Sequence, residues 1–292
     1  MELGRLLTAM VTPFDSDLNV DYKAAERLAQ HLIDTGTQGI VVSGTTGESP
    51  TLTTAEKLEL FKVVKGVAAG KAAVIAGTGN YCTAESIELS RQAEKIGVDA
   101  VMLVAPYYNK PSQEGLYQHF KAVAQSISIP VILYNVPTRT VTNIEPQTII
   151  RLSEIPNIVS VKEASKNLEA VAEIRANTPP SFLIYSGDDG VTLPIMAVGG
   201  HGIISVAGHL AGKLIREMVD KFAAGDTAGA LELHLKLLPL FKAIFVTTNP
   251  VPVKYGLNRI GVPVGGVRLP LVEANEKERA VVDAALQGLG LI

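Results

Sequence analysis

One lysine stands where a covalent catalyst is expected. Lys162 closes the run Ile158-Val159-Ser160-Val161-Lys162, and alternate side chains of a strand share a face, so Ser160 and Lys162 point the same way. The opposite face, with Val159 and Val161, suits packing against helices, so the face with the lysine points towards the interior of the fold. An ordinary lysine is almost fully protonated at neutral pH, but desolvation lowers its pKa and makes the amine a nucleophile. Lys162 is therefore the candidate Schiff-base residue; the alternative is an ordinary lysine at a strand end.

A tyrosine at the end of the preceding strand-length run is the expected neighbour of this lysine. That run is Val131-Ile132-Leu133-Tyr134. Neighbouring strands lie roughly 4.8 Å apart, so a phenol at the end of one can reach an amine at the end of the next. Such a phenol can relay protons during imine and carbon–carbon bond formation. The alternative is a core tyrosine with a structural hydrogen bond, and the pairing with Lys162 favours the catalytic interpretation.

Two further features suit the carboxylates of a small acid. The turn Gly44-Thr45-Thr46-Gly47-Glu48 offers backbone amides and two hydroxyls, and converging N–H groups bind a carboxylate. Arg139 offers a planar fork suited to a second carboxylate. The alternatives are a turn that only reverses the chain and a loop arginine paired with an acid. Lys254 competes as the nucleophile, but the prolines before it place it in a helix start outside the strands, and we reject it.

The sequence carries no pattern typical of a metal centre. It contains no HExxH, no paired histidines and no CxxC. Asp188-Asp189 is the most metal-like feature, and magnesium there is the alternative to two solvated acids in a turn. The single cysteine, Cys82, excludes an internal disulfide framework and fits a reducing compartment.

Strand-length apolar runs recur along the chain and must position these side chains. They are Leu6–Val11, Gly39–Ser43, Ala73–Ala76, Ala100–Ala105, Val131–Asn135, Ile158–Lys162, Phe182–Ser186 and Gly202–Val206. Most are nearly continuous in apolar residues, as in strands covered on both faces. Amphipathic stretches lie between them, for example Tyr22–Thr35, Thr54–Ala69, Thr83–Ile96, Gln113–Ser126 and Glu145–Ser153.

Eight strands that alternate with helices predict a closed (β/α)8 TIM barrel, whose active site lies at the carboxyl ends of the strands. A doubly wound open sheet is the alternative, but the first turn lacks a GxGxxG fingerprint. After Val206 we expect helices only, over Ala211–Ala224, Thr227–Phe245, Val253–Arg259 and Glu273–Gln287. We therefore expect a catalytic barrel over residues 1–224 and a C-terminal helical segment packed on it over residues 225–292.

Composition excludes several classes of protein. The chain has 292 residues, 47% of them hydrophobic, which suffices for one large α/β core. Its 26 basic and 29 acidic residues give a net charge of −3, and no basic stripe suggests nucleic acid. No apolar run reaches the length of about 18 residues that a membrane span needs, and the first residues are unlike a signal peptide. We expect a cytoplasmic protein that binds neither nucleic acid nor membranes.

Six motifs carry a resemblance to a known family. GTTGES (44–49), PYYNKP (106–111), YNVPTRT (134–140), KEAS (162–165), SGDD (186–189) and GHGIISV (200–206) stand in the order found in the dihydrodipicolinate synthase family. Its members are now called 4-hydroxy-tetrahydrodipicolinate synthases, and they belong to the Schiff-base aldolases together with N-acetylneuraminate lyase. The similarity runs from Thr8 to about Arg259 and includes NPVPVKYGLNRIG. GTTGES together with YNVPTRT is typical of the synthase branch.

The resemblance implies condensation of pyruvate with L-aspartate 4-semialdehyde, the first committed step towards diaminopimelate and lysine. It implies that Lys162 attacks pyruvate and that Tyr134 shuttles protons in a relay with Thr45 and Tyr108. The counterpart of Tyr108 reaches over from a partner subunit. The resemblance therefore implies a tight dimer within a homotetramer, a dimer of dimers.

The same resemblance assigns the substrate-binding residues. Thr46 and Ile204 match positions that hold pyruvate, and Gly187 contributes backbone nearby. Arg139 matches the arginine associated with the semialdehyde carboxylate. No cofactor and no metal are implied, because the amine itself is the electron sink.

One departure from the family concerns inhibition by L-lysine. Lysine-inhibited members carry histidines in the helix after GTTGES and an asparagine near GTG. This chain has Thr54, Lys57 and Tyr81 at those positions. The matches to other parts of that regulatory pocket are kept, at Ser49, Glu85 and Tyr107. We expect feedback inhibition by lysine to be weak or absent.

Two alternatives differ in function. A sister aldolase acting on a sugar-derived 2-keto acid would share the lysine chemistry. Arg139 discriminates against it, because a polyhydroxy aldehyde does not need a cation. A catalytically silent barrel that senses a small acid is the second alternative. The intact set of Lys162, Tyr134, Thr45 and Tyr108 argues against that interpretation.

Overall fold

The computed structural model describes residues 3–292, and among these residues eight parallel strands form a closed barrel. Neighbouring strands follow chain order from β1 to β8. The strands are β1 (Leu6–Ala9), β2 (Gly39–Val42), β3 (Ala73–Gly77), β4 (Ala100–Val104), β5 (Val131–Asn135), β6 (Ile158–Glu163), β7 (Leu183–Ser186) and β8 (Gly202–Ser205). The predicted (β/α)8 barrel is confirmed.

Helices connect the strands and continue after the last one. They are α1 (Tyr22–Asp34), α2 (Thr54–Ala68), α3 (Thr83–Ile96), α4 (Gln113–Ala124), α5 (Pro137–Thr140), α6 (Pro146–Leu152), α7 (Leu168–Ala176), α8 (Thr192–Ala197), α9 (Gly208–Ala223), α10 (Thr227–Ala243), α11 (Val251–Arg259) and α12 (Glu276–Gly288). Short 3-10 turns, η1 (Ser49–Thr51) and η2 (Asp189–Val191), follow β2 and β7. The helical C-terminal stretch that the sequence predicts is confirmed.

Local sequence signals begin and end several helices. The Thr53 hydroxyl accepts from the Glu56 N–H, and the Glu56 carboxylate accepts from the Thr53 N–H, so α2 starts with a capping box. The Ser112 hydroxyl accepts from the Gly115 N–H at the start of α4. Gly97 ends α3 with a φ of +88°, a conformation that glycine adopts without strain.

The structure differs from the predicted elements around β1 and α9. β1 ends at Ala9 rather than Val11, because the Val11 N–H donates to Nε2 of His209, at 3.1 Å, instead of to a strand carbonyl. Burial lowers the pKa of His209 to about 4, so its ring stays neutral and can accept this bond. α9 begins at Gly208, ahead of the predicted start, and Ala211 has non-helical dihedral angles where two helical pieces join.

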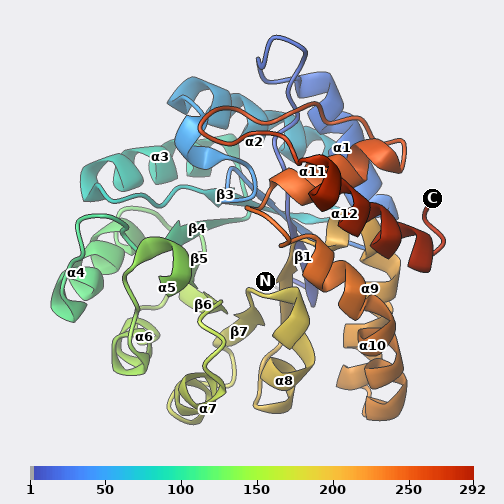
Figure 1. The fold of residues 1–292 in the computed structure, drawn as a ribbon. Coiled ribbons are helices and arrows are strands. Elements are labelled where there is room, and N and C mark those ends of the chain that lie inside the picture. Colours follow the sequence, from blue (N-terminus) through green and yellow to red (C-terminus); the bar gives the residue numbers. More distant parts are fainter. Residues whose placement is uncertain (1–2) are drawn as a thin grey trace. The chain divides into compact units, whose positions relative to one another are not determined.

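Two compact units make up the chain, and each is described by itself. The first comprises Met1–Ala73 and Ser205–Ile292, and the second comprises Val74–Ile204. In the first unit α10 packs along α9 and α12 along α11, and in the second α3, α4, α6 and α7 pack on one another in chain order (Figure 1). The predicted boundary after residue 224 falls in the turn between α9 and α10; as a domain boundary it stays a prediction.

The strands are buried on both faces, as their apolar sequences indicate. Every residue of β5 and β8 is buried. A few polar side chains are buried with them, including Asn135, Lys162 and Glu163. Burying a polar or charged group is unfavourable unless it is hydrogen-bonded or serves a function, so these residues mark the part of the barrel where a functional site is expected.

Candidate active site

Lys162 and Tyr134 stand side by side at the carboxyl ends of two hydrogen-bonded strands. Tyr134 of β5 pairs with Lys162 of β6 in the parallel ladder. The Lys162 Nζ atom lies 4.3 Å from the centroid of the Tyr134 ring. The two residues are 4% and 5% exposed. An amine and a phenol-bearing ring are therefore in contact away from bulk water, as the order of the two strands predicts.

The surroundings of Lys162 favour its neutral form. Burial lowers the pKa of this amine from 10.5 to about 8; the charge of Asp189 opposes that change and the charge of Arg139 adds to it. At pH 7 a pKa near 8 leaves roughly a tenth of the amine neutral, against about 0.0003 for an ordinary lysine. The expected lowering of the pKa is present, and the amine can act as a nucleophile.

The backbone at Gly187 closes in on the lysine side chain. The Gly187 N–H donates to the Glu163 carbonyl at 2.8 Å and so ties the end of β7 to β6. A Cβ atom on Gly187 would lie 2.7 Å from the Ala164 Cβ and 3.2 Å from the Lys162 Cε. Only glycine fits here without displacing these neighbours. Ile204 lies in the same unit and is fully buried in β8.

Arg139 lies on α5, a single helical turn that begins at Pro137. Its side chain is exposed, and its charge contributes to the lowered pKa of Lys162. The Thr140 hydroxyl lies 3.1 Å from the Val136 carbonyl and 2.8 Å from that of Thr142, which braces this short helix. Arg139 thus follows closely after the end of β5, the strand that carries Tyr134.

In the other unit, the turn over residues 44–48 is shaped largely by its own backbone. The N–H groups of Gly47 and Ser49 donate to the Gly44 carbonyl, at 3.0 and 3.3 Å. The Glu48 N–H donates to the Thr45 carbonyl at 3.1 Å. Because these three amides are already bonded, fewer of them remain for a ligand carboxylate than the sequence suggests.

The hydroxyls of this turn have different surroundings. Thr46 is buried, and its Oγ1 accepts from Nδ2 of Asn249 at 2.9 Å. Thr45 is half-buried. The Thr12 hydroxyl donates to the Gly47 carbonyl at 2.7 Å, which fastens the turn to the segment after β1. Thr46 is therefore held from the C-terminal part of the chain, a contact that the sequence did not reveal.

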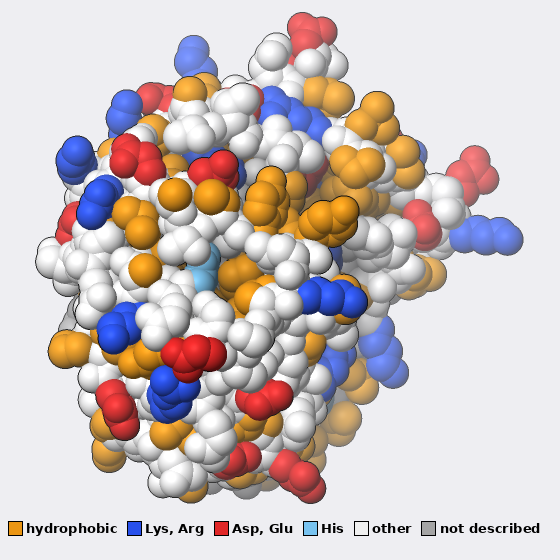
Figure 2. Space-filling view, turned by 90° about the vertical axis from the view of Figure 1, so that its left-hand side faces the viewer, with side chains coloured by type: hydrophobic (Ala, Val, Ile, Leu, Met, Phe, Trp, Pro, Cys, Tyr) orange, Lys and Arg blue, Asp and Glu red, His pale blue; other side chains and the backbone are white. Residues whose placement is uncertain are grey.

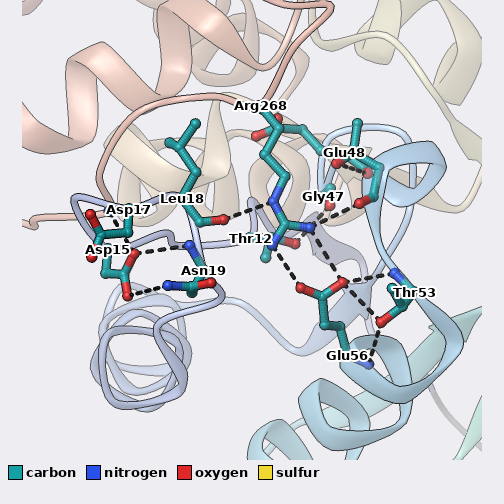
Figure 3. Close-up of polar contacts among 11 residues, drawn as sticks. Thr12, Asp15, Asp17, Leu18, Asn19, Gly47, Glu48, Thr53, Glu56 and Arg268 are labelled. Atoms are coloured by element: carbon teal, nitrogen blue, oxygen red, sulfur yellow. Dashed lines mark hydrogen bonds and ion pairs between the residues drawn. The ribbon is translucent and has the colours of Figure 1, made fainter.

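A buried ion pair holds the end of the same turn. Glu48 has a left-handed backbone, with a φ of 54°. Its Oε1 accepts from Lys254 Nζ, and its Oε2 accepts from the Arg268 N–H, both at 2.9 Å. The Arg268 guanidinium donates in turn to the Leu18 carbonyl and the Glu56 carboxylate (Figure 3). Two distant stretches of sequence are thereby joined through one carboxylate.

Lys254 has the lowered pKa of a nucleophile, but its contacts are those of a residue that stabilises the fold. Burial lowers its pKa to about 8, and Glu48 opposes that change. Its Nζ also donates to the Gly266 carbonyl and lies 4.1 Å from the centroid of the Phe14 ring. An ammonium engaged by a carboxylate, a carbonyl and a ring face is not available to a keto acid. The geometry therefore agrees with rejecting Lys254 in favour of Lys162.

Tyr108 is presented to the outside of the chain. It is 92% exposed and has a φ of 75°, which is unfavourable for a residue with a side chain. Backbone strain of this kind persists where the surrounding structure holds the residue in place, and it is common at functional sites. Within this single chain Tyr108 is directed outwards, and Lys162 lies among buried side chains.

The residues matched to a regulatory pocket divide between the two units. In the second unit the Tyr107 ring meets the Tyr81 ring edge-on, with centroids 5.2 Å apart. Burial raises the pKa of Tyr107, and the nearby charges of Tyr81 and Glu85 add to the rise. The Glu85 carboxylate accepts from Nδ2 of Asn80 at 2.8 Å. In the first unit the Ser49 hydroxyl accepts from that of Ser43 at 3.3 Å.

Charged side chains of both signs occur on the surface of the protein. Figure 2 shows acidic and basic side chains interspersed over the described residues of the face it presents. Residues 3–292 hold no cluster of three or more His, Cys, Asp or Glu side chains placed to bind a metal ion. In the same range, none of the helices combines the length and apolar character that crossing a membrane requires.

Known proteins match this chain along its whole length. The model of the dihydrodipicolinate synthetase family matches residues 2–289. Relatives named 4-hydroxy-tetrahydrodipicolinate synthase include one from Moorella thermoacetica, 58% identical over 100% of both chains. Another, from Desulforamulus reducens, is 55% identical over 100% of this chain and 99% of that relative.

Solved structures give the same result. A dihydrodipicolinate synthase from Bacillus anthracis has a TM-score of 0.96 and 50% identity, with 98% of each chain covered. One from Cyanidioschyzon merolae, described with lysine bound, has a TM-score of 0.98 and 46% identity, with 99% of each chain covered. This chain therefore belongs to the dihydrodipicolinate synthetase family.

Proposed function

We propose that this protein condenses pyruvate with L-aspartate 4-semialdehyde through a Schiff base on Lys162, in the pathway to diaminopimelate and lysine. Family membership makes it an enzyme of the Schiff-base lyase and synthase type, and its relatives carry the name of the synthase. One observation carries the choice of nucleophile. It is the buried Lys162 amine, with its pKa lowered to about 8 and its Nζ 4.3 Å from the Tyr134 ring.

The chemistry follows from a neutral amine next to a phenol. The Lys162 amine attacks the keto carbon of pyruvate, and loss of water gives an imine. The imine nitrogen accepts electrons when a proton leaves the pyruvate methyl group, and the resulting enamine carbon attacks the aldehyde carbon of the semialdehyde. The Tyr134 hydroxyl, on the neighbouring strand, passes protons to and from these intermediates. The amine supplies the electron sink, so the proposed reaction requires no cofactor.

The remaining roles follow from the match to the family motifs. We assign Thr45 and Tyr108 to the proton relay with Tyr134. Thr46, Gly187 and Ile204 are assigned to pyruvate. The close approach of Gly187 to Lys162 supports its assignment. Arg139 is assigned to the semialdehyde carboxylate, and its exposed guanidinium near the lysine supports that role.

Tyr108 supports a further part of the proposal, that the active enzyme is a homotetramer built from tight dimers. A strained tyrosine that is 92% exposed is suited to complete a site on a second copy of the chain. Analytical ultracentrifugation of the purified protein tests the assembly. A fully active monomer would contradict a role for Tyr108 across an interface. The cytoplasmic location stays a prediction, which cell fractionation tests.

The proposed regulatory pocket comprises Ser49, Glu85 and Tyr107, with Tyr81 replacing the asparagine of lysine-inhibited members. The Tyr81 ring packs edge-on against Tyr107, and Glu85 is already bonded to Asn80. These contacts support weak or absent inhibition, because a lysine ligand would compete with them. Potent inhibition of the purified enzyme by sub-millimolar L-lysine would contradict this proposal.

A variant of Arg139 distinguishes the proposed function from the sister-aldolase alternative. Arg139→Ala should raise the KM for semialdehyde far more than the KM for pyruvate, because the guanidinium pairs with the semialdehyde carboxylate. Small and equal effects on both values would favour the sugar-derived substrate. Turnover of an aldose but not of the semialdehyde would decide for the sister activity.

The test of the nucleophile is chemical trapping. Borohydride reduction in the presence of pyruvate should fix a pyruvyl group on Lys162, which mass mapping of peptides locates. The same protein should then turn over L-aspartate 4-semialdehyde in a coupled assay. An adduct on Lys254 or another lysine would overturn the site assignment, and absence of any adduct would overturn the Schiff-base mechanism.

A further inference from the structure

Two buried polar residues stand behind the Lys162–Tyr134 pair. Asn135 and Glu163 follow Tyr134 and Lys162 in β5 and β6, and they pair with each other in the ladder. Because strand side chains alternate, Asn135 and Glu163 point to the opposite face from the amine and the phenol. Each of the two is 1% exposed. They therefore form the outer-face counterpart of the proposed catalytic pair.

The Asn135 amide connects both strands with the loop that follows β5. Its Nδ2 donates to Oε2 of Glu163 at 3.0 Å and to Oδ1 of Asn143 at 2.9 Å. Its Oδ1 accepts from the Ile144 N–H at 3.0 Å. Both donors and an acceptor position of this amide are thus in use. Since Arg139 lies between Asn135 and Ile144, the amide also closes the loop that carries the arginine.

Glu163 ties three strand ends together. Its Oε1 accepts from the Ser165 N–H at 2.6 Å, and its backbone carbonyl accepts from the Gly187 N–H at 2.8 Å. Its side chain lines a cavity of about 490 Å³ together with residues of α6 and α7, so it faces the helices and not the barrel interior. Burial raises the pKa of this carboxyl group, and the bonds from Asn135 and Ser165 oppose the rise.

We propose that Asn135 and Glu163 are positioning residues for the lysine chemistry, holding the ends of β5 and β6 so that Tyr134 stays against Lys162 and the Arg139 loop stays closed. The proposal rests on the proposed function, because it concerns the same amine. The hydrogen bonds of Asn135 and Glu163 are buried, and hydrogen bonds away from water are strong. Because these two residues directly follow the reacting ones in β5 and β6, their bonds control the separation of the amine and the phenol. A misplacement of about 1 Å in an active site can lower the rate ~100-fold.

The first experiment removes each polar group while keeping volume. Asn135→Leu and Glu163→Leu should each lower kcat by ~10–100-fold, the range expected for sub-ångström to ångström displacement. Asn135→Leu should in addition raise the KM for semialdehyde, because Asn135, unlike Glu163, accepts directly from the Ile144 N–H of the Arg139 loop. Glu163→Leu should leave that KM within about twofold of the wild-type value. A purely structural role would not produce this split.

A matched control lies at the other end of β6. The Asn157 amide lies 2.8, 3.2 and 3.4 Å from the carbonyls of Ala124, Ile127 and Ile129. Asn157→Leu therefore also removes a multiply bonded amide next to the same strand, but away from Lys162. It should lower the melting temperature and leave kcat within about twofold of the wild-type value.

A polarity swap keeps the test decisive if the leucine variants do not fold. Asn135→Asp sets two carboxyl groups against each other and should lower kcat. Adding Glu163→Gln supplies a donor to the new carboxylate and should recover kcat by about tenfold relative to Asn135→Asp, since hydrogen bonding between the two positions returns. Circular dichroism confirms that each variant is folded before its kinetics are compared.

The outcomes separate the two proposals. If wild-type protein forms no pyruvyl adduct on Lys162, the proposed function fails. If the wild type is active but the leucine variants keep wild-type kcat and KM, or lose no more activity than Asn157→Leu, the positioning role is refuted. In the swap experiment, a double variant no more active than Asn135→Asp refutes the positioning role as well.

Discussion

Replacing Lys254 by methionine is expected to destabilise the folded protein strongly, because it leaves the Glu48 carboxylate buried without its cation. The two side chains are 2% and 1% exposed, and Nζ lies 2.9 Å from Oε1. After the change Oε2 keeps the Arg268 N–H, but Oε1 loses the ammonium. Breaking a buried pair in this way lowers the free energy of unfolding by ~3–5 kcal/mol.

This loss converts into a measurable change in melting temperature. The entropy of unfolding is ~2.1 cal/mol/K per residue, which is ~0.6 kcal/mol/K for a chain of this length. Lys254→Met should therefore lower the midpoint by ~5–8 °C. Thermal unfolding followed by circular dichroism measures it, and urea titration gives the free energy independently.

A second variant tests the reason for the loss. Burial holds the pKa of Lys254 near 8 even beside Glu48, so desolvation outweighs the attraction within the pair. Lys254→Met combined with Glu48→Gln removes both charges and keeps an acceptor for the Arg268 N–H. Replacing both members of a buried pair is often neutral, so the double variant should regain most of the stability.

The control is a more exposed ion pair between Arg259, on the same helix as Lys254, and Asp283 of α12. Arg259 Nε lies 2.9 Å from Asp283 Oδ1, the same separation, but these side chains are 45% and 27% exposed. Arg259→Gln should lower the free energy of unfolding by at most ~1 kcal/mol. The reasoning is refuted if Lys254→Met is no more destabilising than Arg259→Gln, or if the double variant is as unstable as the single one.

Three more outcomes follow from the surroundings of Lys162. The value of kcat/KM for pyruvate should rise with pH and level off above about 8, as the amine loses its proton; a flat profile between pH 6 and 9 would contradict the lowered pKa. Lys162→Met should abolish borohydride trapping and stabilise the fold at pH 7 by up to ~3 kcal/mol, since a lysine pKa that is lower in the folded state penalises folding while the amine is charged. That gain should be complete below pH 8 and vanish as the pH approaches 10.5, where the unfolded lysine is also losing its proton; urea titrations across this range measure it. Gly187→Ala should lower kcat at least about tenfold in steady-state assays, because its Cβ would lie 2.7 Å from the Ala164 Cβ and 3.2 Å from the Lys162 Cε; wild-type kcat would show that the site yields.

The barrel and the central pair of the site could be predicted because both depend on local patterns. β5 has the predicted bounds, and β6 extends one residue beyond them to Glu163. Successive strands of a (β/α)8 barrel are neighbours, so the contact between Tyr134 and Lys162 follows from the strand order alone. Short segments such as α5 carried a weaker signal, because four residues are too few to show helical periodicity.

The supporting contacts could not be predicted from the sequence. Asn135 and Glu163 are polar residues at the ends of apolar runs, and only the ladder register shows that they face each other. Lys254 stands in the sequence as a lysine near prolines, whereas its partner Glu48 belongs to a turn 206 residues earlier. Periodicity and capping describe neighbours in the chain, and neither rule says which distant side chain will meet a buried carboxylate.

The distance in sequence between Glu48 and Lys254 has a consequence for synthesis of the chain. The ribosome adds ~5–20 residues per second, so it incorporates Glu48 tens of seconds before it reaches Lys254. Throughout that interval the carboxylate has no ammonium to meet, so it must remain hydrated and its turn cannot settle into the arrangement of the finished protein. The first half of this barrel is therefore completed by residues that are translated last.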